Sequence, residues 1–350
     1  MDISRILKPG WQPARLVLLA SGLLLAACTA SPESAAARDP ATPPGLAQAA
    51  DSLPLPTLVP SVSPTTPPTN TPPPTATPSA TLTPVDTPTP TLSPTPTATP
   101  VTLNDIPLDD VIVLTGGARQ HIRQIADRGR ALGRNPHAFA RIGGSVAATQ
   151  HFMGRFDSGP YDLGPYDDLQ ATIDYYKGSF SRVGQGAMRG LTAKATFNPT
   201  WSDPDFCQPN ETVIDCEIRL HNPSVIIIVL GTNDIGTGEK FETDMRALLA
   251  HIIELGIVPI LATKSDRYEG PDDRNNTIIR ELAADLQIPL WDFDLIAGTI
   301  PGRGMGSDNV HLTLYDQYDY TSDRALQRGY GVYNLTALMM LDAVRQELAP

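Results

Sequence analysis

The chain has 350 residues and a formal net charge of −12, and 35 of its residues are prolines. Of these prolines, 18 lie between residues 41 and 100, together with 16 threonines and only two charged residues. Such a segment cannot bury a core, which leaves roughly 240 residues for one sizeable α/β domain or two small ones. The acidic balance excludes binding to nucleic acid through a general basic surface.

Residues 1–27 have the pattern of a secretory signal. Arg5, Lys8 and Arg15 precede an apolar run that is too short to span a bilayer comfortably. The run ends in Leu-Ala-Ala followed by Cys28, which resembles the lipobox of bacterial lipoproteins. The resemblance implies that Cys28 is lipidated, that residues 1–27 are removed, and that the protein is anchored to the membrane outside the cytoplasm. The alternative is an ordinary signal peptide with a chance cysteine.

Residues 28–105 are predicted to form a disordered tether. Thr-Pro, Ser-Pro and Pro-Pro pairs recur through most of this segment. Proline fixes φ and has no N–H, so neither helix nor sheet can propagate, and a solvated, extended chain is expected. The tether would carry a domain away from the membrane. The alternative is a low-complexity segment with no length requirement, and the sequence leaves O-glycosylation of its threonines open.

Residues 106–350 have the composition of a folded domain in which helices alternate with strands. The run from Val225 to Leu230 is continuously apolar, which is typical of a strand buried on both faces. The alternation indicates a parallel sheet covered by helices on both sides, with an active site at the carboxyl ends of the strands. In chain order the pattern predicts a helix at 121–132, a strand at 138–142, a helix at 169–176, a strand at 223–230, a helix at 243–255, a strand at 257–262, a helix at 276–286, a strand at 288–293 and a helix at 333–348.

Two cysteines of the domain, Cys207 and Cys216, are nine residues apart. In an exported chain two such thiols are expected to form a disulfide, and a reduced, buried pair is the alternative. A zinc site is not expected, because the chain has no C-x-x-C and no histidine within four residues of either cysteine.

Polar residues that carry chemistry follow the predicted strands. Together they supply a hydroxyl, an amide, a carboxylate, an imidazole and a turn that can present N–H groups, which are the parts needed for acyl transfer through a serine. The motifs are Gly143-Gly144-Ser145, Val183-Gly184-Gln185-Gly186, Gly231-Thr232-Asn233-Asp234 and Asp308-Asn309-Val310-His311. The spacing of Gly184, Gly186 and Gly190 is one residue too long for a dinucleotide-binding loop.

The order and spacing of these motifs resemble the SGNH, or GDSL-like, hydrolase family. The resemblance implies a flavodoxin-like three-layer α/β/α sandwich with a parallel sheet. It places the nucleophile on Ser145 and the aspartate–histidine pair on Asp308 and His311. It places the oxyanion hole on Ser145, Asn233 and Gly186, with Gly184 as the alternative to Gly186. Gly144 stands where the family usually has an aspartate, and Asp234 is expected to cap the following helix.

The expected chemistry is that of a serine esterase. The imidazole of His311 takes the proton of Ser145, Asp308 orients that imidazole, and the hydrogen-bond donors stabilise the oxyanion. The signal pattern and the family resemblance together imply an exported, lipid-anchored enzyme that hydrolyses carboxylic esters, and the resemblance implies acetyl esters of carbohydrates or lipid esters as substrates, with no cofactor and no metal. The alternatives are a non-catalytic surface binding or adhesion module of the same fold, and an acyltransferase. Residues 266–268 follow a strand and either line the site or form an ordinary loop.

Overall fold

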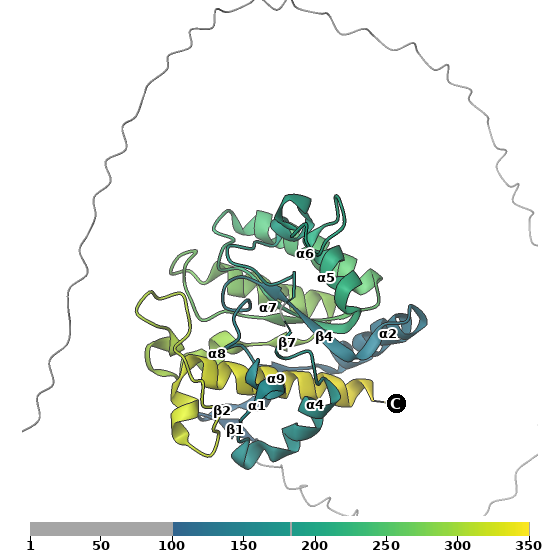
Figure 1. The fold of residues 1–350 in the computed structure, drawn as a ribbon. Helices are drawn as coiled ribbons and strands as arrows, with labels where there is room; N and C mark the ends of the chain where they lie inside the picture. Colours follow the sequence, from purple (N-terminus) through teal and green to yellow (C-terminus); the bar gives the residue numbers. More distant parts are fainter. Residues whose placement is uncertain (1–100, 183, 350) are drawn as a thin grey trace, which may run out of the picture. The chain divides into compact units, whose positions relative to one another are not determined.

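The computed structural model describes residues 101–182 and 184–349 (Figure 1). Cys28, the predicted signal and most of the predicted tether lie outside the described residues. Residues 102–105, which the composition assigned to the tether, begin the described fold. They contribute strand β1 (Thr102–Leu103), which pairs with β2 (Ile106–Pro107) in a small antiparallel ribbon.

The domain is built on a five-stranded sheet with the order β3-β7-β6-β5-β4. Strands β4 (Asn135–Gly143), β5 (Pro223–Val229), β6 (Val258–Ala262) and β7 (Leu290–Trp291) are parallel, and β3 (Ile112–Val113) is antiparallel to β7. Ala187, which belongs to none of these strands, forms one parallel bridge with Gly143 at the end of β4. When this bridge is counted as a strand, the parallel order is that of flavodoxin, 2-1-3-4-5. The predicted α/β fold is confirmed, with an antiparallel edge strand that the sequence pattern did not indicate.

Helices cover both faces of the sheet (Figure 1). On one face lie α5 (Val213–His221), α6 (Gly238–Glu254) and α7 (Arg274–Leu286). On the other lie α2 (Gly116–Ala131), α4 (Gln170–Tyr175), α8 (Phe293–Ala297) and α9 (Gly329–Leu348). Two further helices, α1 (Leu108–Val111) and α3 (Arg155–Ser158), have only four residues each.

Strand β5 divides its side chains between these two layers. Ile226 and Ile228 belong to the core under α5, α6 and α7, whereas Val225, Ile227 and Val229 belong to the core under α2 and α9. Side chains of a strand point alternately to the two faces of its sheet, so an unbroken apolar run is what a strand covered on both faces requires.

Side-chain caps explain where several elements begin. The Thr237 hydroxyl accepts the Lys240 N–H, so α6 starts well before the predicted residue 243. Asp292 accepts the Leu295 N–H and starts α8, which confines the predicted strand 288–293 to two residues. Helix α5, which the sequence pattern did not predict, is capped by Thr212.

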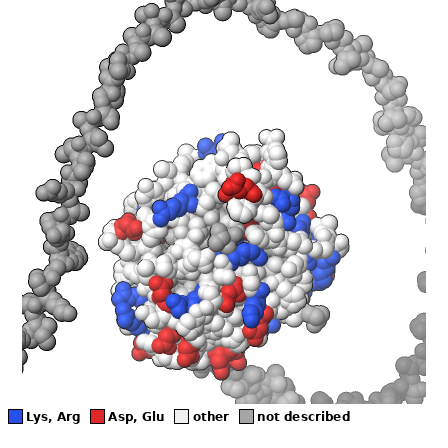
Figure 2. Space-filling view, viewed as in Figure 1, with Lys and Arg blue, Asp and Glu red and all other residues white. Residues whose placement is uncertain are grey.

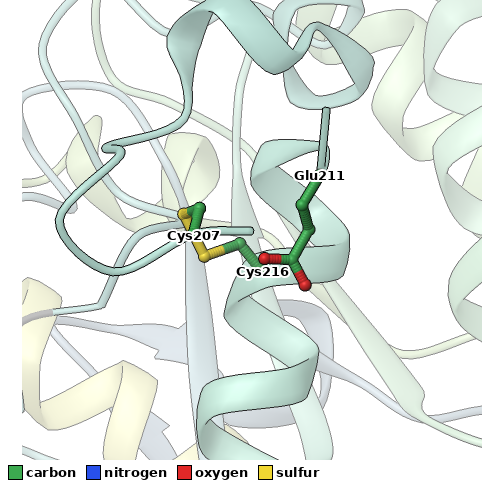
Figure 3. Close-up of side chains that lie close together, drawn as sticks. All are labelled: Cys207, Glu211 and Cys216. Carbon is green, nitrogen blue, oxygen red and sulfur yellow. A yellow bond between two sulfur atoms is a disulfide. The ribbon is translucent and has the colours of Figure 1, made fainter. Parts of the chain in front are cut away.

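Cys207 and Cys216 form the expected disulfide, at an S–S distance of 2.08 Å (Figure 3). Glu211 lies beside the two sulfur atoms, but its carboxylate is bound by Arg219 at 2.7 and 2.8 Å. Because the sulfurs are bonded to each other, they offer no thiolate to a metal. The disulfide ties the loop before α5 to the first turns of that helix.

Within residues 101–182 and 184–349, no helix is both long enough and apolar enough to cross a bilayer. The face of the domain seen in Figure 2 carries Lys and Arg side chains interspersed with Asp and Glu side chains.

Candidate active site

Ser145 lies in a tight turn at the carboxyl end of β4. The N–H groups of Ala147 and Ala148 both donate to the Gly144 carbonyl at 3.1 Å, so the chain coils immediately after the strand. Gly143 permits this path, because a Cβ there would lie 2.5 Å from the Val229 carbonyl oxygen. The turn leaves the Ser145 side chain half-buried at the edge where the parallel strands end.

The turn places Ser145 against the late loop that carries His311, although 166 residues separate them. His311 Nε2 lies 2.8 Å from Ser145 Oγ, and His311 Nδ1 lies 2.7 Å from Asp308 Oδ2. Because a carboxylate only accepts hydrogen bonds, Nδ1 carries the proton and Nε2 is left to accept the serine hydroxyl proton. The three side chains that the sequence singled out are therefore joined in one hydrogen-bonded series.

Asp308 is held in its charged form. Its Oδ2 binds the His311 ring, and its Oδ1 accepts the N–H groups of Val310 at 3.0 Å and His311 at 2.9 Å. These hydrogen bonds, that of the imidazole first, hold the pKa of Asp308 well below its usual range. The side chains of His311 and Asp308 are 47% and 53% exposed, so the reacting groups are open to solvent on one side.

Asn233 brings an amide to the same edge of the sheet. It follows β5, and its Nδ2 donates to the Leu191 carbonyl at 3.2 Å. A Cβ at Gly144 would lie 2.8 Å from this Nδ2 atom, which places the amide directly beside the residue that precedes Ser145. The glycine at position 144 therefore has a physical reason: any larger residue would displace the Asn233 amide.

Gly186 does not have the role that the resemblance assigned to it. Its N–H donates to the buried Glu217 carboxylate at 2.9 Å, and its carbonyl accepts the Gly143 N–H at 3.0 Å. The expectation that the Gly186 N–H stabilises an oxyanion is therefore wrong, because that donor is already used inside the protein. The alternative, Gly184, also lies against Glu217, since a Cβ there would be 2.6 Å from both carboxylate oxygens.

Gly190 is a glycine of the same loop that sequence reasoning did not consider for the oxyanion hole. It adopts φ +80°, and it directly precedes Leu191, whose carbonyl binds the Asn233 amide. Its N–H, like that of Ser145, donates to none of the residues that the structure describes. The only sequence signal was a glycine just before the apolar Leu191, and spacing alone does not separate this glycine from Gly184 and Gly186.

Asp234 has the structural role expected of it, although not as a helix cap. Its carboxylate accepts the N–H groups of Ala193 at 2.9 Å and Gly231 at 3.0 Å, which ties the two loops of the site together. Burial raises the pKa of Asp234.

A small cavity opens beside Ser145. Its volume is about 20 Å³. One ordered water needs about 10–15 Å³, so the cavity has room for one or two small groups. The aromatic rings of Phe293 and Tyr333 are among its walls, and the Tyr333 hydroxyl is buried without a hydrogen-bond partner among the described residues. The remaining walls are Gly144, Val146, Val229, Thr232, Lys264, Ser265, Asp266, Val310 and Leu312.

The residues after β6 divide between this cavity and the surface. Asp266 lines the cavity, where it binds Lys264 Nζ at 3.0 Å and the Thr232 hydroxyl at 2.9 Å. Arg267 turns away and pairs with Asp294 at 2.7 Å. Tyr268 is 60% exposed. Of residues 266–268, only Asp266 therefore lines the space next to the serine.

No family model and no curated protein matches this chain. Among solved structures it is similar to the psychrotrophic esterase EstA from Pseudoalteromonas sp., at 16% identity and a TM-score of 0.37, covering 59% of this chain and 97% of that one. It is similar to a GDSL-like lipase from Bacteroides thetaiotaomicron, at 17% identity and a TM-score of 0.34, covering 65% and 98%. It is also similar to a mutant of Axe2, an acetyl-xylooligosaccharide esterase from Geobacillus, at 13% identity and a TM-score of 0.38, covering 58% and 93%. Likenesses at this level say nothing about the reaction.

Proposed function

We propose that this protein is a serine hydrolase of the SGNH type that cleaves carboxylic esters through an acyl-enzyme on Ser145. The observation that carries the proposal is the hydrogen-bonded series from Ser145 Oγ through the His311 ring to Asp308, with contacts of 2.8 and 2.7 Å. A serine hydroxyl needs a neutral imidazole in contact with it, and that imidazole needs an acceptor on its other nitrogen.

The reaction has two steps. Ser145 Oγ attacks the acyl carbon while His311 Nε2 takes the hydroxyl proton, and the tetrahedral intermediate then expels the alcohol, which receives that proton. In the second step water attacks the acyl carbon, His311 takes a proton from the water, and the acid leaves as Ser145 Oγ is reprotonated. Asp308 stabilises the imidazolium in both steps.

Three donors are available to the oxyanion: the N–H groups of Ser145 and Gly190 and the Nδ2 amide of Asn233. All three come from the loops that meet beside Gly144, and donors placed before the reaction stabilise the negative charge without reorganisation. Gly190 replaces Gly186 in this role, because the Gly186 N–H is bound to Glu217.

The size of the cavity favours a short acyl group. A volume of about 20 Å³ beside Ser145 accommodates a methyl group but not a fatty acyl chain. On the other side, His311 and Asp308 are about half exposed, so the alcohol is free to belong to a large molecule. We therefore favour acetyl esters of carbohydrates over lipid esters.

The proposed location is the outer side of a membrane, with Cys28 lipidated and residues 28–101 acting as a tether. The support for this location is the basic, apolar and lipobox pattern of residues 1–28 together with the disulfide of the domain. Fractionation of cells that express Cys28→Ala tests it: the variant should leave the membrane fraction, and full retention contradicts lipid anchoring.

Hydrolysis of p-nitrophenyl acetate by the full-length chain tests the reaction. The wild type should be active, Ser145→Ala should lose activity without a change in melting temperature, and Ser158→Ala in α3 should keep both. Equal rates in the wild type and Ser145→Ala would contradict the proposed esterase. They would leave the alternative function, a non-catalytic adhesion module of the same fold. Comparison of acetate, butyrate and octanoate esters tests the acyl preference, since an octanoate rate equal to that of acetate contradicts the short pocket. Ester products formed with an added alcohol would identify an acyltransferase.

A further inference from the structure

Glu217 is a buried carboxylate outside the proposed catalytic machinery. It lies on α5, directly after the disulfide residue Cys216, and is 1% exposed. Buried carboxylates are rare because they lose hydration, so they are retained where other groups bind them. One oxygen, Oε2, accepts the backbone N–H groups of both Gln185 and Gly186, at 2.5 and 2.9 Å.

The loop is shaped to reach this carboxylate. At Gly184 a Cβ would lie 2.6 Å from both Glu217 oxygens, and at Gly186 a Cβ would lie 2.3 Å from Ile142 Cδ1 and 2.8 Å from the Arg141 carbonyl oxygen. Neither position therefore accepts a side chain without movement of the loop. The two glycines allow the backbone to pass between α5 and the edge strand β4.

From this anchor the loop continues to the proposed oxyanion hole. The Gly143 N–H donates to the Gly186 carbonyl and the Met188 N–H donates to the Gly143 carbonyl, both at 3.0 Å, so the loop is fastened to the strand that carries Ser145. A few residues later the Leu191 carbonyl accepts the Asn233 amide at 3.2 Å. The position of that carbonyl sets the direction in which the other N–H of the amide points.

Two arginines lie near Glu217, but neither guanidinium group binds its carboxylate. Burial raises its pKa, and the positive charges of Arg182 and Arg141 oppose that rise. Their guanidinium groups donate to carbonyls, that of Arg141 to Phe152 at 2.8 Å and that of Arg182 to Phe139. His221 on the same helix lies 3.7 Å from Oε2, and burial lowers its pKa to about 4, so it is neutral near pH 7. The two backbone N–H groups are thus the groups that Glu217 holds in place.

We infer that Glu217 is a positioning residue of the oxyanion hole: it holds the loop of residues 184–191 so that Leu191 aims the Asn233 amide at the substrate. This inference rests on the proposed function. Glu217 touches no reacting atom in this account and acts only through the loop.

Two variants at position 217 separate acceptance of the N–H groups from charge. Glu217→Gln keeps a carbonyl oxygen that can accept both N–H groups, so kcat should stay within about threefold of the wild type. Glu217→Met removes the acceptor and should lower kcat by about 10- to 100-fold, with KM changed less than about threefold, because a misplaced donor weakens the transition state more than substrate binding.

A third variant disturbs the same contact without changing a charge. Gly184→Ala pushes a methyl group against the Glu217 oxygens and should lower kcat as Glu217→Met does, which keeps the test open if Glu217→Met fails to fold. The matched control is Gly116→Ala in α2, where a Cβ meets nothing within 4 Å.

A double-mutant cycle distinguishes positioning from a general loss of structure. In an Asn233→Ala background, Glu217→Met or Gly184→Ala should cost clearly less than in the wild-type background, since one of the two donors that this loop positions is already absent and only the Gly190 N–H remains. Folded single variants with the wild-type kcat, or losses of the same size in the Asn233→Ala background, would overturn the inference.

A measurement that does not depend on ester hydrolysis separates this inference from the proposed function. The side-chain amide signal of Asn233 in the ¹⁵N NMR spectrum is identified by its absence in Asn233→Ala. It should shift in Gly184→Ala and stay in place in Gly116→Ala and Glu217→Gln, whether or not the protein hydrolyses esters. An unmoved signal in folded Gly184→Ala overturns the inference, whereas an inactive wild type overturns the proposed function alone.

Discussion

Gly144 offers the sharpest perturbation of the proposed oxyanion hole. Gly144→Ala adds a Cβ that would lie 2.8 Å from Asn233 Nδ2, whereas ordinary van der Waals contact begins at 3.4 Å. The amide must therefore retreat by about 0.6 Å. Its hydrogen bond to the Leu191 carbonyl, at 3.2 Å, is already long, so the amide has little freedom to retreat while that bond is kept.

The expected loss follows from the value of one oxyanion donor. Complete removal of such a donor typically lowers the rate by about 10²–10³-fold, and displacement by a fraction of an ångström removes part of that. We expect Gly144→Ala to lower kcat by about 10- to 100-fold, which corresponds to about 1.4–2.7 kcal/mol in the activation barrier. The melting temperature should change little, because only the end of the Asn233 side chain has to move.

The assay is hydrolysis of p-nitrophenyl acetate, with kcat and KM measured separately for the wild type, Gly144→Ala and Asn233→Ala. The double variant should resemble Asn233→Ala alone, since both changes act on the same amide. Gly116→Ala is again the control for glycine replacement in open space. A folded Gly144→Ala enzyme that works at the wild-type rate would refute the placement of Asn233 as a donor.

Three further predictions concern pH and stability. First, because its hydrogen bonds hold the pKa of Asp308 well below its usual range, Asp308 should add no proton to the acid limb of kcat/KM, which should depend on one proton only; a two-proton dependence contradicts this. Asp308→Asn should lower kcat on the order of 10³–10⁴-fold. Second, the disulfide closes a loop between two cysteines that are nine residues apart. Replacing both cysteines by serine should lower the free energy of unfolding by about 2–3 kcal/mol and the melting temperature by roughly 5–10 °C in calorimetry. An unchanged melting temperature contradicts this prediction. Third, burial raises the pKa of Glu217, so the folded state binds the carboxyl proton more tightly than the unfolded chain does. The free energy of unfolding should therefore fall as pH rises above the ordinary carboxyl pKa. Glu217→Gln should reduce this fall when urea unfolding is measured at several pH values, and an identical pH dependence in the wild type and the variant contradicts the prediction.

The sequence predicted the central part of the fold because that part depends on local pattern. The apolar run of β5 reads as a doubly covered strand, and the alternation around it implies a parallel sheet. The pattern missed β3, which has only two residues and pairs with β7 in the opposite direction. It also missed α5, which starts at a threonine cap inside a segment dominated by turns.

The candidate site shows the same division. Ser145, Asn233, Asp308 and His311 stand in recognisable motifs directly after strands or on one short loop, so their proximity could be inferred. The roles of individual glycines could not be inferred, because a glycine motif records only that the backbone passes close to something. The partner of Gly186 is Glu217, which lies 31 residues away in sequence. Only three-dimensional contacts reveal that pairing.

The central claim is that one hydroxyl, that of Ser145, carries the acyl group. Its most direct measurement is mass spectrometry of peptides from the full-length protein after reaction with a p-nitrophenyl alkylphosphonate, alongside residual ester hydrolysis. We predict a single phosphonyl adduct on Ser145, loss of activity in proportion to labelling, and no adduct in Ser145→Ala. Undiminished hydrolysis by protein fully labelled at Ser145, or inactivation with that residue unmodified, would contradict the account.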